Sequence, residues 1–184
     1  MRKSVLAEVI QRRLGVPIGR TCSLAQRATE AGLVPKAAGR SCPHLTAPEA
    51  ATFLIAALAD RGLGRVAETV EAFTKLRSGS DVLLKTLTGL FEGQMTLQIA
   101  ANGFIIFHLD PAAVSLTVAG VHRRFGPQPS ETAAGKSVAI PGRAVAAVAL
   151  EFLGKTPEEA DALIAAARTA RSPHFAEAYE GSFL

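Results

Sequence analysis

The sequence contains only two cysteines, Cys22 and Cys42, among its 184 residues. Two thiols cannot form the disulfide framework on which small secreted domains rely, so we expect a reducing compartment. No C-x-x-C pair is present, and adding His44 to the two cysteines still leaves a structural zinc site one ligand short. We therefore interpret both cysteines as small buried hydrophobic side chains and expect no metal and no cofactor.

Long apolar runs are also missing from the sequence. The apolar stretch at 144–154 is well short of the roughly 18 residues that a membrane-spanning helix needs. The basic N-terminus is soon interrupted by Glu8 and Arg12-Arg13, and no small-residue cleavage site follows it. We therefore expect neither a membrane anchor nor a signal peptide, and we expect a cytoplasmic location.

Acidic residues are scarce in the first quarter of the chain. Through residue 44 the sequence has eight Lys and Arg residues against two Glu, a local charge of +6, so the remaining residues carry −2 of the net +4. A basic segment on a neutral-to-acidic body is typical of proteins that bind a polyanion. The alternative is a surface that is basic and simply solvated.

Two helices joined by a tight turn are predicted at this basic end. Residues 4–14 place apolar side chains at helical spacing, and Gly15 is suited to end the helix. The turn V-P-I-G-R precedes a second helix, for which Ser23 and Gln26 form a predicted capping box. Helix, short turn and helix make the helix-turn-helix pattern, whose second helix enters the major groove of DNA.

The turn-rich strip that follows is predicted to form a small β-wing. Residues 33–35 leave the second helix extended, a glycine-containing turn spans 36–40, and 41–45 return. Thr46 then opens a third helix through a T-x-x-E capping box with Glu49. The basic tip of such a wing can reach the phosphate backbone while the recognition helix occupies the groove.

The order of these motifs resembles the winged helix-turn-helix of MerR-type regulators and of phage excisionase-like proteins. The shared features are Leu14-Gly15-Val16, a helix ending in A-G-L-V-P, a wing arginine and a helix opened by T-x-x-E. The resemblance covers about the first 60 residues. Pro43-His44-Leu45 departs from it, because the family has an arginine-aromatic strand in the wing. The resemblance implies a DNA-binding protein with a winged helix-turn-helix.

Residues for DNA contact are assigned on this basis. Those predicted to face base edges are Thr21, Ser23, Leu24, Gln26 and Arg27. Those predicted to bind phosphates are Arg2, Lys3, Arg12, Arg13, Arg20, Lys36 and Arg40. One winged helix buries too little DNA-facing surface for strong specificity, so we expect a homodimer that reads two half-sites of double-stranded DNA.

The predicted fold class is α+β, mostly helical, with a DNA-binding domain at 1–60 and a second body at 61–184. In the body, helices are predicted at 63–77, 81–92, 143–153 and 157–171, the last opened by a capping box at Thr156. A hairpin at Asn102-Gly103 and a third strand over 113–121 predict a three-stranded antiparallel sheet. This body is suited to dimerisation or to binding a ligand or protein partner, or it only completes the core.

No constellation for catalysis is found. The sequence A-G-K-S at 134–137 lacks the first glycine of a Walker A loop, because Ser130 stands five positions before Gly135. We interpret Lys136, with Arg123, Arg124 and Arg143, as a solvated cluster or a secondary phosphate contact. His108 lies near Asp110, but no nucleophile is placed beside it.

The leading hypothesis is therefore a sequence-specific DNA-binding transcriptional regulator related to phage proteins, and not an enzyme. A second hypothesis keeps the DNA and makes the chain a packaging or recombination adaptor, such as a small terminase subunit or an excisionase. A third makes it an adaptor without duplex DNA, whose sheet binds RNA or a protein.

Overall fold

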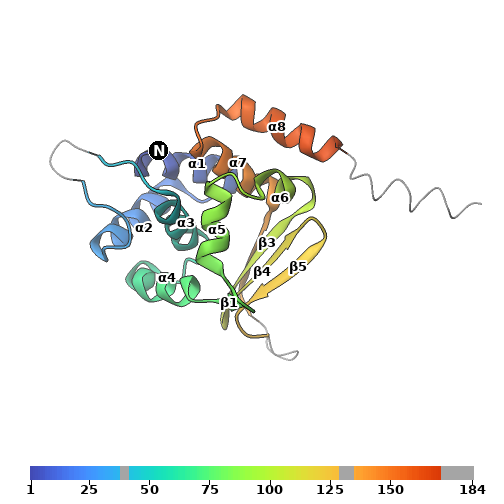
Figure 1. Ribbon diagram of the computed structural model, residues 1–184. Coiled ribbons are helices and arrows are strands. Elements are labelled where there is room, and N and C mark those ends of the chain that lie inside the picture. The colour runs from blue at the N-terminus through green and yellow to red at the C-terminus, as the bar shows by residue number, and fades with distance from the viewer. Residues whose placement is uncertain (38–41, 129–134, 171–184) are drawn as a thin grey trace, which may run out of the picture.

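Helices dominate the structure, a computed structural model of the chain that describes residues 1–37, 42–128 and 135–170 (Figure 1). The fold is α+β, as predicted. The helices are α1 (Lys3–Leu14), α2 (Ile18–Glu30), α3 (Ala47–Leu58), α4 (Val66–Thr74), α5 (Leu83–Phe91), α6 (Thr96–Asn102), α7 (Gly142–Phe152) and α8 (Pro157–Thr169). The strands are β1 (Arg77–Ser78), β2 (Asp81–Val82), β3 (Phe104–Leu109), β4 (Ala112–Val118), β5 (Val121–Phe125) and β6 (Ser137–Pro141). None of the helices in these ranges is long and apolar enough to cross a membrane.

The boundaries of the first two helices follow from their backbone. Gly15 follows α1 with φ of 72°, a left-handed conformation that suits glycine, and the predicted end of this helix is confirmed. Pro17 precedes α2, and its carbonyl accepts the N–H of Thr21 at 2.9 Å. Helix α2 therefore begins before Ser23, and the capping box predicted at Ser23 is wrong.

Helix α3 lies at the centre of the helical part. Its predicted capping box is confirmed, with the N–H of Thr46 donating to Glu49 Oε2 at 2.7 Å. Every residue from Ala50 to Leu58 is buried, and α3 packs against α2, α4 and α5. A helix that is apolar on all sides needs such complete cover, so α3 fixes where α2 can sit.

The segment between α2 and α3 contains no strand in its described parts, residues 31–37 and 42–46. An isolated bridge instead joins His44 to Arg2 at the start of α1. Prolines in both arms remove N–H donors that a strand pair needs. The predicted β-wing is therefore not found in these residues, and its tip residue Arg40 lies outside the described part.

The hairpin predicted at Asn102-Gly103 is wrong, because residues up to Asn102 form α6. Gly103 has φ of −95° and ψ of 163°, which is extended backbone and not a turn. A Cβ at this position would lie 2.6 Å from the carbonyl oxygen of Ile99 and 2.7 Å from that of Thr117. The glycine is needed because two backbones meet closely here.

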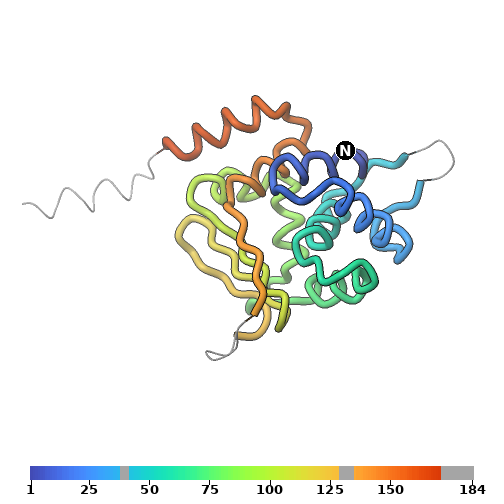
Figure 2. The backbone as a smooth tube through the Cα atoms, turned by 180° about the vertical axis from the view of Figure 1, so that it is seen from behind, coloured from blue at the N-terminus to red at the C-terminus, as the bar shows by residue number. Residues whose placement is uncertain are grey.

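The main sheet has four antiparallel strands in the order β5-β4-β3-β6, where three were predicted. The predicted third strand corresponds to β4, whereas β5 and β6 were not predicted. Strand β6 comes back after a long connection and pairs with the free edge of β3. Helices α6 and α7 pack on one face of this sheet, and Figure 2 shows the same arrangement from behind.

Helices α7 and α8 lie close to their predicted spans, and the capping box at Thr156 is confirmed. Helix α1 packs on α7, and α3 packs on α5. A single hydrophobic cluster accordingly contains Leu6, Phe53, Phe107 and Val148. The core therefore runs without interruption across residue 60, where the sequence predicts a domain boundary.

Candidate nucleic-acid interface

Helix α2, the predicted recognition helix, has one buried and one exposed face. Its buried residues are Thr21, Leu24, Ala25 and Ala28, which recur at helical spacing and face the neighbouring helices α1 and α3. Thr21 and Leu24 have no exposed surface, so their predicted contact with base edges is wrong. The outward face carries Cys22, Gln26, Arg27 and Glu30, with Ser23 half-buried beside them. Cys22 and Cys42 are both exposed, so their predicted burial is wrong.

Glu30 holds two of the predicted base-reading side chains. Gln26 Nε2 donates to one of its carboxylate oxygens at 2.9 Å, and Arg27 Nη1 donates to the other at 2.8 Å. The hydrogen bond from Gln26 is the main reason that the pKa of the Glu30 carboxyl is lowered, and the hydrogen bond from Arg27 is the second. The Ser23 hydroxyl donates to the carbonyl of Gly19 at 2.8 Å, which leaves its oxygen free to accept. Such exposed contacts are weak and exchange readily with a competing partner.

Arg20, a predicted phosphate ligand, makes a bidentate ion pair with Asp60 just after α3. Its Nε and Nη2 donate to the two carboxylate oxygens at 2.5 and 2.7 Å, and the N–H of Gly62 donates to the same carboxylate at 2.9 Å. The hydrogen bond from Arg20 is the main reason that the pKa of Asp60 lies below its usual value. Arg20 therefore anchors α2 to the chain beyond α3.

Replacing Asp60 with asparagine is expected to lower the free energy of unfolding by about 1 kcal/mol at pH 7, since the ion pair is bidentate but partly exposed. A carboxyl with a depressed pKa in the folded state stabilises above its unfolded pKa of about 3.9, and this contribution disappears as the pH falls through the folded pKa. Urea unfolding of wild type and Asp60→Asn between pH 7 and pH 3 should show the difference shrinking below about pH 4.

A matched control for this titration is Glu68→Gln, which removes an exposed pair with Arg65 one turn away. The control should change stability much less than Asp60→Asn at neutral pH. A cost for Asp60→Asn that stays constant down to pH 3 contradicts the role given to the ionised carboxylate.

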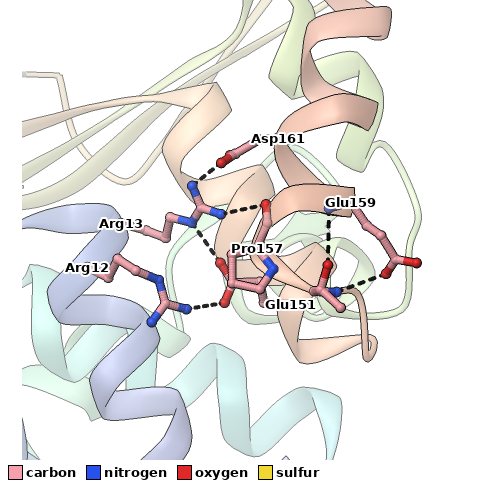
Figure 3. Close-up of polar contacts among 7 residues, drawn as sticks. Arg12, Arg13, Glu151, Pro157, Glu159 and Asp161 are labelled. Carbon is pink, nitrogen blue, oxygen red and sulfur yellow. Dashed lines mark hydrogen bonds and ion pairs between the residues drawn. The ribbon is translucent and has the colours of Figure 1, made fainter.

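Arg12 and Arg13, also predicted phosphate ligands, face the C-terminal helices instead. Both donate to the carboxylate of Glu151 in α7, Arg13 through Nε at 2.7 Å (Figure 3). Arg13 also donates to Asp161 Oδ1 at 2.6 Å and to the Pro157 carbonyl at 3.1 Å, and its side chain is only 15% exposed. The predicted phosphate contact of Arg13 is therefore wrong, and Arg12 is bound to the same carboxylate.

The remaining predicted cations gather beside α2. Arg2, Lys3 and Lys36 form no ion pair with any residue that the structure describes. Lys3 Nζ donates to Thr29 Oγ1 at 2.5 Å and to the Pro35 carbonyl at 3.3 Å, which joins the start of α1 to the end of α2. These cations therefore occupy one surface, where the start of α1 lies beside the end of α2.

This surface is hollowed by a groove of about 620 Å³ between α1, α2 and residues 36–37. Its lining includes Lys3, Ala7, Cys22, Gln26, Thr29 and Lys36. A smaller hollow of about 120 Å³ adjoins it through Lys3 and Ala37 and adds Arg2 and Cys42. The groove therefore combines an apolar floor with two lysines, a glutamine and the carboxylate of Glu30, and we refer to it as the α2 groove.

The structure thus divides the predicted site residues into separate groups. Gln26, Lys3 and Lys36 meet at the α2 groove, with Arg2 adjacent. Arg20 and Arg27 are two helical turns apart and share the other edge of the exposed face of α2. Sequence reasoning missed the carboxylates that bind several of these cations, because no local pattern links a cation to an acid far along the chain.

Metal binding finds no support in the described residues, where no group of three or more His, Cys, Asp or Glu side chains could hold an ion. Comparison with known proteins finds no family model, no curated protein and no solved structure that matches this chain. The function is therefore inferred from the geometry of the chain itself.

Proposed function

We propose that the chain is a sequence-specific double-stranded DNA-binding protein, a transcriptional regulator, whose helices α1 to α3 act as a helix-turn-helix. The observation that carries this proposal is the exposed face of α2, where Gln26 and Arg27 stand beside the cations of the α2 groove. A recognition helix needs this combination of polar side chains for base edges and flanking cations for phosphates.

Gln26 and Arg27 are the proposed base-reading residues. The amide of glutamine matches the edge of adenine, and the guanidinium of arginine matches that of guanine, each through two hydrogen bonds. In the free protein both side chains are held by Glu30 on an exposed surface. Exchanging these contacts for bases costs little, since exposed ion pairs contribute at most about 1 kcal/mol. Glu30 therefore serves to orient the two side chains before DNA binds.

Lys3, Lys36 and Arg2 are the proposed phosphate contacts. They lie around the N-terminal end of α1, which has no acidic residue in its first turn. The partial positive charge at a helix N-terminus adds to that of the side chains. Arg40 stays in the proposed set on the strength of the sequence alone, as does homodimerisation, which would supply two half-sites.

The test is a pair of substitutions with opposite expected signatures. Arg27→Ala should weaken binding to a cognate site by about 1–3 kcal/mol and relax the sequence preference, because a base contact is lost. Lys36→Ala should weaken binding to all duplexes alike and reduce the slope of log K against log salt by about one. Cognate DNA selected from a random duplex pool provides the site, and fluorescence anisotropy in a salt series measures both effects.

Arg65→Ala is a matched control, because Arg65 also pairs with a glutamate three residues ahead on an exposed helical turn. It should leave DNA affinity unchanged. Equal losses for Arg27→Ala on cognate and scrambled duplexes would remove the base-reading role, and the absence of any duplex binding at low salt would overturn the proposed function.

A further inference from the structure

The four-stranded sheet has a second face that α6 and α7 do not cover. Residues paired directly across neighbouring strands lie on the same face. Ile105, Phe107, Val114, Leu116, Phe125 and Ile140 alternate toward the helices and belong to the hydrophobic core. The residues between them point the opposite way, and Figure 1 shows the sheet at the edge of the molecule with the helices on its other side. We refer to this second face as the open face.

The open face is a grid of three rows across the strands. From β5 to β6, the first row is His122, Thr117, Phe104 and Pro141, the second is Arg124, Ser115, Ile106 and Ala139, and the third, which starts at β4, is Ala113, His108 and Ser137. No carboxylate occurs among these eleven residues, whereas Arg124 carries a permanent positive charge. The face is thus suited to an anion and not to a cation.

A polar line crosses all four strands of this grid. Arg124 Nη1 donates to Ser115 Oγ at 3.3 Å, His108 Nε2 lies 3.3 Å from the same oxygen, and Ser137 is paired with His108 on β6. Arg124 is held in place by a second hydrogen bond, from Nε to the Pro127 carbonyl at 2.9 Å. The guanidinium is therefore fixed flat against the sheet.

One nitrogen of this guanidinium has no acceptor within residues 1–37, 42–128 and 135–170. Arg124 Nη2 is buried and makes no hydrogen bond to any residue that the structure describes. Buried donors without a partner are rare, because each costs the desolvation of the group. Burial, followed by the charge of Arg124, lowers the pKa of His108, so this imidazole adds no positive charge at neutral pH but can still hydrogen-bond. Arg124 is therefore a fixed cation in the centre of this face, and the described residues do not use its full hydrogen-bonding capacity.

Phe104 supplies the other element of the open face. It lies at the start of β3, in the row between Thr117 and Pro141, and its side chain is 40% exposed. In the second row Ile106 follows Phe104 on the same strand, and the two residues that flank Ile106, Ser115 and Ala139, are small. A flat aromatic ring on a sheet surface is a stacking platform for a planar ligand.

We propose that the open face binds a single strand of nucleic acid, with a base stacked on Phe104 and backbone phosphates at Arg124 and His122. Strands lie about 4.8 Å apart and alternate residues about 6.8 Å, so Phe104 and Arg124 are about 12 Å apart across the sheet, a span of roughly two nucleotides. Bases in a duplex are stacked on one another and cannot reach Phe104, which restricts this face to unpaired strands. This proposal is independent of duplex binding through α2.

The experiment uses the full chain and fluorescein-labelled 12-mers of dT and rU, which do not form secondary structure, in low salt. Both strands should bind, since stacking and phosphate contacts are shared, and a clear preference for rU would assign contacts to the 2′-hydroxyl. Phe104→Ala should weaken binding about 5- to 100-fold, as expected for the loss of one base–aromatic stack. Arg124→Gln should weaken it and reduce the salt dependence.

Leu97→Ala is the matched control, because Leu97 is an exposed apolar side chain of similar exposure, 43%, on α6. It should leave single-strand binding unchanged, and Phe104→Ala should leave duplex binding through α2 unchanged. No binding of either 12-mer, or binding that Lys36→Ala weakens and Phe104→Ala does not, overturns the proposal. Failure of duplex binding with retained, Phe104-dependent single-strand binding rejects the function proposed for α2 and supports this one.

Discussion

Replacing Glu151 with glutamine is expected to lower the free energy of unfolding by about 3 kcal/mol, because it leaves buried arginine contacts without their charge partner. The Glu151 carboxylate is only 4% exposed and accepts hydrogen bonds from both Arg12 and Arg13. Breaking a buried pair by removing one partner is far more costly than the pair is worth against an apolar substitute. The magnitude is placed at the low end because Arg12 keeps 46% of its side-chain surface exposed.

Asp161→Asn is the matched control for Glu151→Gln. Asp161 pairs with the same Arg13, at 2.6 Å, but is 61% exposed, so its loss should cost less than about 1 kcal/mol. Urea unfolding followed by circular dichroism measures both variants against wild type. Equal costs for the two variants would show that burial of the carboxylate does not set the energy of this cluster. Glu151→Gln should also weaken duplex binding, because α2 packs on α1 and Glu151 binds the two arginines of α1.

Gly142→Ala is expected to destabilise the protein by about 3 kcal/mol or more, the upper end of overpacking costs. A Cβ at this position would lie 2.2 Å from the carbonyl oxygen of Ile99 and 2.6 Å from that of Gly103. Both obstacles are backbone atoms, which cannot rotate away as a flexible side chain can. The N–H of Gly142 also donates to the Gly103 carbonyl at 2.7 Å, so the two segments cannot separate without losing this hydrogen bond.

Gly19→Ala provides the matched comparison, because Gly19 lies in the first turn of α2 as Gly142 lies in that of α7. A Cβ at Gly19 meets no atom within 4 Å, and alanine in a helix is favoured over glycine by about 0.5–1 kcal/mol. Thermal and urea unfolding should show Gly19→Ala equal to or above wild type in stability and Gly142→Ala far below it. Similar stabilities for the two variants would contradict the close backbone approach at Gly142.

Helix starts were predicted well where a nearby side chain caps the free backbone N–H groups of the first turn. Thr46 and Thr156 each stand three residues before a glutamate, and both capping boxes form as the spacing predicts. The start of α2 was misplaced because Ser23 and Gln26 have the same spacing, whereas the helix begins directly after Pro17, whose carbonyl accepts the N–H of Thr21. Of the two possible helix starts, Pro17 and Ser23, the chain uses the earlier one.

The sheet was predicted only in part, because the glycine at its start is required by residues that are distant in the sequence. Asn102-Gly103 has the sequence of a tight turn, yet Gly103 is required by the backbones of Ile99 and Thr117. Thr117 approaches Gly103 only after β4 has paired with β3, so a short stretch of sequence around Gly103 does not reveal the need for glycine. Strand β6 follows the long connection from β5 and pairs with β3, which is non-local in the same way.

The candidate interface shows the same division between local and distant causes. Helical periodicity identifies the apolar stripe of α2, and it could have excluded Leu24 from the exposed face. The clustering of basic residues was evident from composition. Which cations remain available was not, because Asp60 lies 40 residues after Arg20 and Glu151 lies 138 residues after Arg13. Only the folded chain shows which positive charges are already neutralised.

The Arg12–Glu151 contact joins positions 139 residues apart, and this has a consequence for the order of events during translation. The ribosome releases α1 long before α7 exists, so the surface of α1 that packs on α7 stays exposed until then, while α2 can already pack on α1. Helix α2 packs against α1, α3 and α4, which all precede residue 75, so its own partners emerge well before α7. A nascent chain halted before α7 carries α1 to α4 but lacks the Glu151 carboxylate, so Arg12 and Arg13 have not yet met the group that fixes the end of α1.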